Sequence, residues 1–97
     1  MFYEIEKLHY MISDTSEIDW EYVNSIEMHP DRVVKIIDQF LLSLLPNHNL
    51  NGKDWFTLQG IAQWISQGNH LTEKQKQYAF VTMALNWDEL DLSKITA

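Results

Sequence analysis

The chain has 97 residues, with 14 Asp and Glu against seven Lys and Arg, so its formal net charge is −7 and its sequence pI is about 4.8. This length predicts one domain with a modest core, and 45% hydrophobic with 22% charged residues excludes a disordered chain. The absence of Cys excludes disulfides, zinc–thiolate sites and cysteine nucleophiles. The sequence starts with acidic residues and has no long apolar segment, so we predict no signal peptide and no membrane span. We therefore expect a soluble, cytoplasmic protein.

The first third of the chain predicts two short helices. Apolar residues recur at helical spacing over residues 2–12, which predicts an amphipathic helix. Ser16, with Asp19 three residues later, predicts the N-cap of a second helix that ends near residue 28. Polar and apolar residues also alternate over 17–22, as in a strand. We favour the helix because no other segment could pair with a single strand.

A third helix is predicted over residues 31–45, where Pro30 suits the first turn and Asp31 faces the helix dipole favourably. Its apolar residues lie nearly all round the cylinder, so we expect it to be the central and most buried helix. Pro46 and a polar loop follow it.

Two further helices are predicted over residues 55–67 and 73–87. Asp54 is the expected N-cap of the first, Gly60 would let a neighbouring helix approach closely, and Gly68 suits a left-handed residue after its end. Thr72 and Gln75 have capping-box spacing at the start of the second. Residues 88–97 either extend this helix or fold back. The sequence therefore predicts an all-α fold, in which residues 1–97 form one compact domain, a bundle of about five short helices.

The negative charge is confined to the acidic N-terminal third, residues 1–31. This segment holds eight acids and one base, a net charge of −7, whereas residues 32–97 hold six of each. Within the neutral part, a secondary acidic cluster consists of Asp88, Glu89 and Asp91. A charge gathered in one third of the chain indicates an electrostatic field directed at a partner.

Two aromatic residues lie among these acids. Trp20 and Tyr22 are two positions apart, so on a helix they cannot both face the core and one must be at least partly exposed. A ring at the rim of the bundle is one interpretation, and an aromatic anchor surrounded by charge, typical of protein-binding patches, is the other. On the second interpretation the predicted partner-binding residues are Glu17, Asp19, Trp20, Glu21, Tyr22, Glu27 and Asp31.

The chain has no pattern typical of a catalytic, metal or cofactor site. Its four His have no pair at metal-ligand spacing, and no Ser lies in a nucleophile-elbow motif. The three Gly lie singly, so they form no phosphate-binding loop. We therefore predict that the protein is not an enzyme and binds neither a metal nor a cofactor.

Residues 54–87 resemble a short two-helix unit that recurs in phage and plasmid proteins. The resemblance is carried by Gln67-Gly68 followed by Leu71-Thr72-Glu73-Lys74-Gln75, in which a Gly turn opens a helix. It covers about a third of the chain and implies an origin in a mobile element. No whole-protein family accompanies it.

Three functions of different classes fit these observations. The first is a small acidic protein-binding module, a phage-encoded stoichiometric inhibitor of a host nucleic-acid-binding machine (an anti-CRISPR or another anti-defence factor), which docks its acidic face on a basic partner surface. The alternative is a nucleic-acid-associated accessory factor in phage replication or transcription that uses the helix starting at Thr72, although so few bases make direct nucleic-acid binding unfavourable. The third is a self-associating module, and hence a homo-oligomer.

Overall fold

Five α-helices make up most of residues 2–95, the part of the chain that the computed structural model describes. They are α1 (Tyr3–Thr15), α2 (Trp20–Ser25), α3 (Pro30–Leu42), α4 (Gly52–Ser66) and α5 (Glu73–Leu85), followed by the 3₁₀ turns η1 (Trp87–Glu89) and η2 (Leu92–Lys94). No strand occurs among these residues, so the predicted all-α fold is confirmed. The Cα radius of gyration, 12.7 Å, matches the ~12.5 Å of a compact domain of this length.

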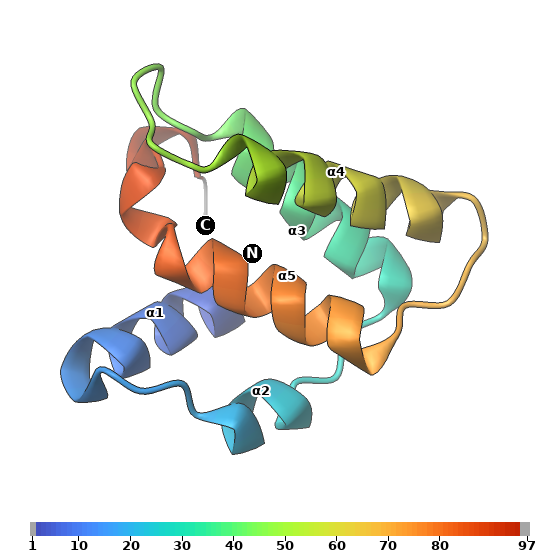
Figure 1. Cartoon of the computed structure of the whole chain (residues 1–97), viewed down its shortest axis with the longest axis horizontal. Helices are drawn as coiled ribbons and strands as arrows, with labels where there is room; N and C mark the ends of the chain where they lie inside the picture. The colour runs from blue at the N-terminus through green and yellow to red at the C-terminus, as the bar shows by residue number, and fades with distance from the viewer. Residues whose placement is uncertain (1, 96–97) are drawn as a thin grey trace.

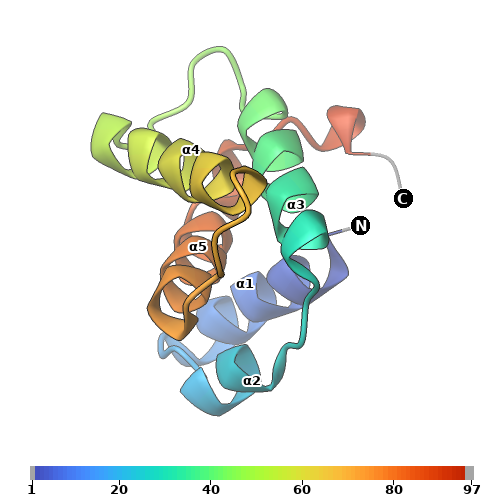
Figure 2. The ribbon, with the colours of Figure 1, turned by 90° about the vertical axis from the view of Figure 1, so that its right-hand side faces the viewer.

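Helix α5 is the centre of the molecule. It packs against α1, α2 and α4, and it lies between the α3–α4 pair and the α1–α2 pair (Figures 1 and 2). Every residue from Ala79 to Ala84 is buried, so this part of α5 is covered on all sides. The prediction that the helix over 31–45 would be central is wrong, because α3 packs mainly on α4 and leaves Leu42 exposed.

The helix ends in the first third differ from those predicted. Helix α1 continues to Thr15 and ends at Ser16, whose φ of 59° is left-handed, so Ser16 does not cap α2. The N-cap of α2 is Asp19, whose Oδ1 accepts the backbone N–H of Tyr22 at 2.9 Å. Residues 20–25 are therefore helical, and the alternative strand over 17–22 does not form.

The ends of α4 and the start of α5 follow local chemistry. Asn51, not Asp54, caps α4 by accepting the Lys53 N–H at 2.8 Å, so this helix begins three residues before the predicted start. Gly68 has a φ of 91°, which confirms its predicted left-handed conformation. The capping box of Thr72 and Gln75 is also confirmed, because each side chain accepts the backbone N–H of the other at 3.1 and 3.0 Å.

The C-terminal segment folds back across the end of α3. Helix α3 ends at Leu42 rather than residue 45, and Leu44 then forms an isolated antiparallel bridge with the buried Leu90. The Asp91 N–H donates to the Ser43 carbonyl at 2.7 Å, which satisfies a carbonyl at a helix end. Of the predicted extension or return over 88–97, residues 88–95 return, and 96–97 lie outside the described part.

Helix α1 is attached to the C-terminal end of α5. The rings of Phe2 and Trp87 meet edge to face with centroids 5.7 Å apart. The His9 ring donates through Nδ1 to the carbonyl of Ala84 at 3.0 Å, and it lies beside Trp87. Ile5 and Leu8 are fully buried on the same side of α1, so the opposite side of this helix faces solvent.

Candidate protein-interaction surface

The seven predicted partner-binding residues lie on α2 and on its two connections to α1 and α3. Five acids are exposed: Glu17, Asp19, Glu21, Glu27 and Asp31. Glu17 and Asp19 line a hollow beside the end of α1, and Glu27 lines another beside the start of α5.

The two aromatic residues of α2 differ in exposure, as their spacing on a helix predicted. The Trp20 side chain is 48% exposed, whereas Tyr22 is half-buried. The Tyr22 hydroxyl donates to the Glu4 carbonyl at 3.3 Å, and the Lys7 ammonium lies 5.1 Å from the centre of its ring. Burial, followed by the nearby Glu4 carboxylate, raises the pKa of Tyr22. Tyr22 thus attaches α2 to α1, and Trp20 is the ring available to a partner.

Most acids of the N-terminal third have no basic partner within the described residues. Two acids are exceptions: Arg32 contacts both carboxylate oxygens of Glu4 at 2.9 and 3.2 Å, and Asp31 lies 3.6 Å from His29. The six acids without an ion pair among residues 2–95 are Glu6, Asp14, Glu17, Asp19, Glu21 and Glu27. All six are exposed to solvent, and of these carboxylates that of Asp19 also caps α2.

Two adjoining hollows, of about 320 Å³ each, run along the solvent side of α1 and share Met11 and Asp14. The first is also lined by Tyr3, Glu6, Lys7 and Tyr10. The second is also lined by Thr15, Glu17, Ile18 and Asp19. We call these two hollows together the acidic groove. It combines four acids with one base and two exposed tyrosines.

Hydrogen bonds to the backbone hold the segment at the end of the acidic groove. The Thr15 hydroxyl donates to the Met11 carbonyl at 2.9 Å and accepts the Glu17 N–H at 3.2 Å. The Ser16 N–H donates to the Ile12 carbonyl at 2.7 Å. These bonds hold the α1–α2 connection, so its carboxylates are presented by an ordered segment.

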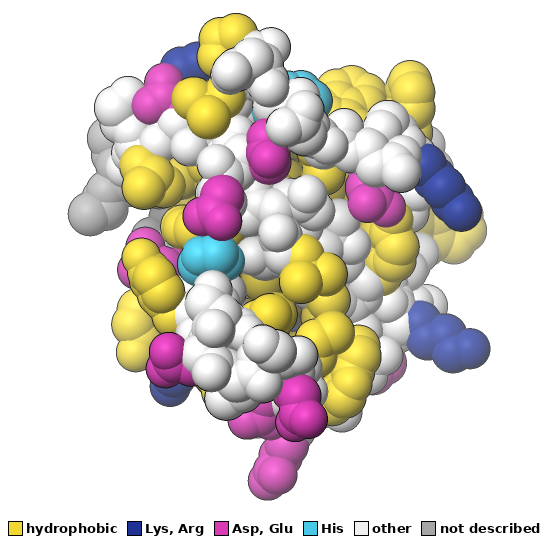
Figure 3. Space-filling model, turned by 60° about the vertical axis from the view of Figure 1, so that its left-hand side comes forward, with side chains coloured by type: hydrophobic (Ala, Val, Ile, Leu, Met, Phe, Trp, Pro, Cys, Tyr) yellow, Lys and Arg dark blue, Asp and Glu magenta, His cyan; other side chains and the backbone are white. Residues whose placement is uncertain are grey.

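Figure 3 brings forward the left-hand side of Figure 1, where α1 ends and the connection to α2 turns. Asp and Glu side chains are spread over this face from top to bottom, with hydrophobic side chains between them. Lys and Arg side chains appear only towards its edges. Acidic and apolar side chains are therefore mixed on this face.

Sequence reasoning missed the α1 half of the acidic groove. Tyr3, Tyr10 and Asp14 are seven and four positions apart in turn, which places them on one side of a helix. The apolar spacing over residues 2–12 marks only the core side of this helix. The outward spacing of aromatic and acidic residues was the signal that could have identified this face.

The secondary acidic cluster is largely used within the fold. The Glu89 carboxylate accepts the Asn49 N–H at 2.7 Å and so holds the α3–α4 loop. Asp91 caps η2, and hydrogen bonds from Ser93 lower the pKa of its carboxyl. Asp88 remains exposed, 3.7 Å from the His9 ring. The cluster is therefore a weaker candidate for partner binding than the groove.

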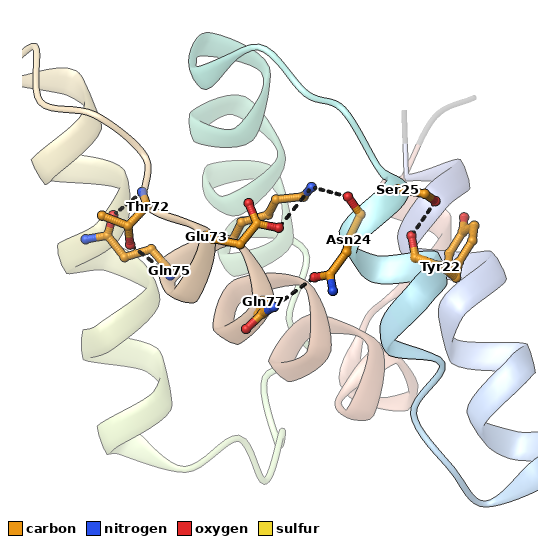
Figure 4. A network of polar contacts seen from close by, with 8 residues as sticks. Tyr22, Asn24, Ser25, Thr72, Glu73, Gln75 and Gln77 are labelled. Atoms are coloured by element: carbon orange, nitrogen blue, oxygen red, sulfur yellow. Dashed lines mark hydrogen bonds and ion pairs between the residues drawn. The ribbon is translucent and has the colours of Figure 1, made fainter.

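The start of α5, on which the nucleic-acid alternative rests, is also occupied by contacts within the chain. Lys76 is buried, and its ammonium lies 3.4 Å from the Asn24 carbonyl and 3.9 Å from Glu73. Gln77 donates to the Asn24 side chain at 2.8 Å (Figure 4). Since Gln75 belongs to the capping box, Lys74 is the base of this helix start that remains exposed.

The described residues contain no group of three His, Cys, Asp or Glu side chains that could hold a metal ion. Within the same part of the chain, no helix has both the length and the apolar character needed to cross a membrane. Comparisons of this chain with protein-family models, curated proteins and solved structures found no match. Any function therefore has to be argued from the surface itself.

Proposed function

We propose that this protein acts by binding a partner protein, with the acidic groove docked on a basic surface of that partner. The observation that carries the proposal is the set of acids without basic partners beside exposed aromatic rings. Four of these acids, Glu6, Asp14, Glu17 and Asp19, line the groove. Such an arrangement supports binding because carboxylates left unpaired by the fold can accept Lys and Arg side chains from outside.

Charge and aromatic contact would have different roles in the complex. Opposite potentials raise the association rate and select against acidic partners, whereas desolvated aromatic anchors slow dissociation. Tyr10 and Trp20, which are 59% and 48% exposed, have the apolar area for the second role. Added salt should therefore lower the association rate, whereas the aromatic contribution to the affinity should remain.

The proposed partner class is a host nucleic-acid-binding machine, because a surface that binds phosphates carries the Lys and Arg that carboxylates also attract. On this proposal the protein is a stoichiometric, phage-encoded inhibitor of the anti-CRISPR or another anti-defence type and performs no catalysis. The nucleic-acid accessory function has less support, because Gln75, Lys76 and Gln77 form hydrogen bonds within the chain.

The test compares two charge reversals that change the net charge equally. Glu17→Lys alters the groove, whereas Asp38→Lys alters an exposed acid of α3 outside it. The tagged protein is used to capture partners from a bacterial lysate, and the affinity for the captured protein is then measured by titration calorimetry. We expect one-to-one binding that competes with nucleic acid, weakened about tenfold or more by Glu17→Lys and less than about twofold by Asp38→Lys.

An equal effect of the two reversals would show that net charge, not the groove, governs binding. Capture only of partners without a basic surface would contradict the proposed partner class. Asp19 is a poor position for this test, because its carboxylate caps α2 and its reversal would also disturb the helix.

A further inference from the structure

Helix α4 contains a glycine that the fold of a single chain does not explain. Gly60 lies in the middle of the helix, where glycine is the least favourable residue after proline. Apart from its two chain neighbours and the nearby backbone of its own helix, no described atom lies within 4 Å of the position that a Cβ would take, and the φ of Gly60 is not positive. The close helix approach that the sequence predicted here is therefore not made within this chain.

Exposed aromatic residues lie on both sides of this glycine. Phe56 and Trp64 are four positions before and after Gly60, so all three residues lie along one side of α4. Phe56 is 69% exposed and Trp64 is 47% exposed. Figures 1 and 2 both show this helix at the outside of the molecule. We call this side the aromatic stripe: Lys53, Phe56, Gly60, Gln63, Trp64 and Gln67, all of which are exposed.

The aromatic stripe differs in charge from the acidic groove. Its one charged residue is Lys53, which has no ion pair among residues 2–95. Asp38 of α3 borders the stripe in a hollow that it shares with Gln63 and Gln67. Two copies of a chain with a net charge of −7 repel one another, and a face with one base and no acid is where that repulsion is weakest.

We propose that the aromatic stripe binds a second copy of this chain, with the two α4 helices antiparallel and crossing at Gly60. A two-fold axis at that point brings the two glycines together, so the helix backbones can approach closely. It also places Phe56 of each copy alongside Trp64 of the other. Lys53 of one copy then lies opposite Gln67 of the other, at the end of the stripe that Asp38 borders, so opposite charges meet there.

This interface is made by one helix face, so its area is below that of a standard stable complex. We therefore expect a dimer that dissociates on dilution. Because the acidic groove is on α1 and the aromatic stripe is on α4, the dimer leaves both grooves free. The proposal does not depend on the function of the groove and can be tested without a partner.

The test is sedimentation velocity of the full chain over increasing concentration. Gly60→Glu adds a side chain and a negative charge at the crossing point without a clash inside its own chain, so it should give a monomer that is at least as heat-stable as the wild type. Trp64→Ser should raise the dissociation constant of the dimer about tenfold or more. Leu85→Glu is the matched control, since it adds the same charge at an exposed apolar position of α5.

Dimerisation of the wild type and of Leu85→Glu, together with its loss in Gly60→Glu, would support the proposal. A wild type that remains monomeric at the highest concentration measured would overturn it. A dimer that persists unchanged in Gly60→Glu would also overturn it, because the interface would then lie elsewhere.

Discussion

Asp14 occupies a position where its charge opposes the fold. It lies in the last turn of α1, which carries no basic residue, so its carboxylate faces the negative end of the helix dipole. It also lines the acidic groove with Glu17 and Asp19, whose charges repel it. We therefore expect Asp14→Lys to stabilise the protein while it weakens binding of the proposed partner.

The magnitude follows from the helix terminus. Removing an acid from the last turn and adding a base there contribute about 0.3–1 kcal/mol each, and exposure favours the lower values. The free energy of unfolding should therefore rise by about 1 kcal/mol, which raises Tm by roughly 4–8 °C in a domain of this size. Thermal unfolding followed by circular dichroism at low salt would measure the change. In about 1 M salt the change should be much smaller, because the Debye length falls to about 3 Å.

Asp31→Lys is the matched control because it makes the same replacement at the opposite kind of helix end. Asp31 lies in the first turn of α3, where a carboxylate is favourable, and it also contacts His29. Each reversal adds two charges, from −7 to −5, yet we expect Asp31→Lys to lower Tm. If both variants shifted Tm in the same direction, net charge rather than position on a helix would control stability, and the reasoning would be refuted.

Three further changes separate the roles of particular residues. Gly60→Ala should raise the free energy of unfolding by about 1 kcal/mol in chemical denaturation, since its Cβ meets nothing, and a loss of stability would show an unseen contact. Lys76→Ala should lower the free energy of unfolding by about 1–2 kcal/mol, because packing and the hydrogen bond to Asn24 are lost. Lys74→Ala should change it by less than about 0.5 kcal/mol, and equal effects of the two variants would contradict the burial of Lys76. Burial and the hydrogen bond to Asp54 raise the pKa of Tyr78 above 10.0, so the contribution of Tyr78 to the free energy of unfolding is complete below pH 10 and is lost as pH rises through the raised pKa. Tyr78→Phe should therefore reduce the loss of stability between pH 8 and 11, and an unchanged pH profile of unfolding would refute the assignment.

The features that the sequence predicted correctly depend on neighbouring residues. The turn at Gly68 and the capping box of Thr72 and Gln75 are set by groups within a few positions of one another, so the chain pattern contains the whole interaction. The N-cap of α4 was predicted at the wrong residue because Asn51 and Asp54 are both good caps, and the choice between them depends on contacts elsewhere in the fold. Asp54 is used by Tyr78 of α5 instead.

The features that the sequence could not supply depend on which helices meet. The first half of α5 is polar, and nothing local indicates that Lys76 is buried against α2 or that Ala79 to Ala84 is covered on all sides. The acidic groove likewise needs the α1–α2 connection to turn back beside α1. The residue types of the candidate surface were predicted from composition and spacing, but their grouping is a tertiary property.

The contact between α1 and α5 has a consequence for the order in which the chain acquires structure during synthesis. Helix α1, which buries Ile5 and Leu8, is synthesised before the α5 that it packs on, and Phe2 meets Trp87, 85 positions later. Contacts between such distant residues slow folding, and the apolar side of α1 stays exposed until α5 has been synthesised. The negative charge of residues 1–31 would oppose association of this exposed segment with other nascent chains. Acids that have no ion pair within the described part of the fold would then also protect the chain during synthesis.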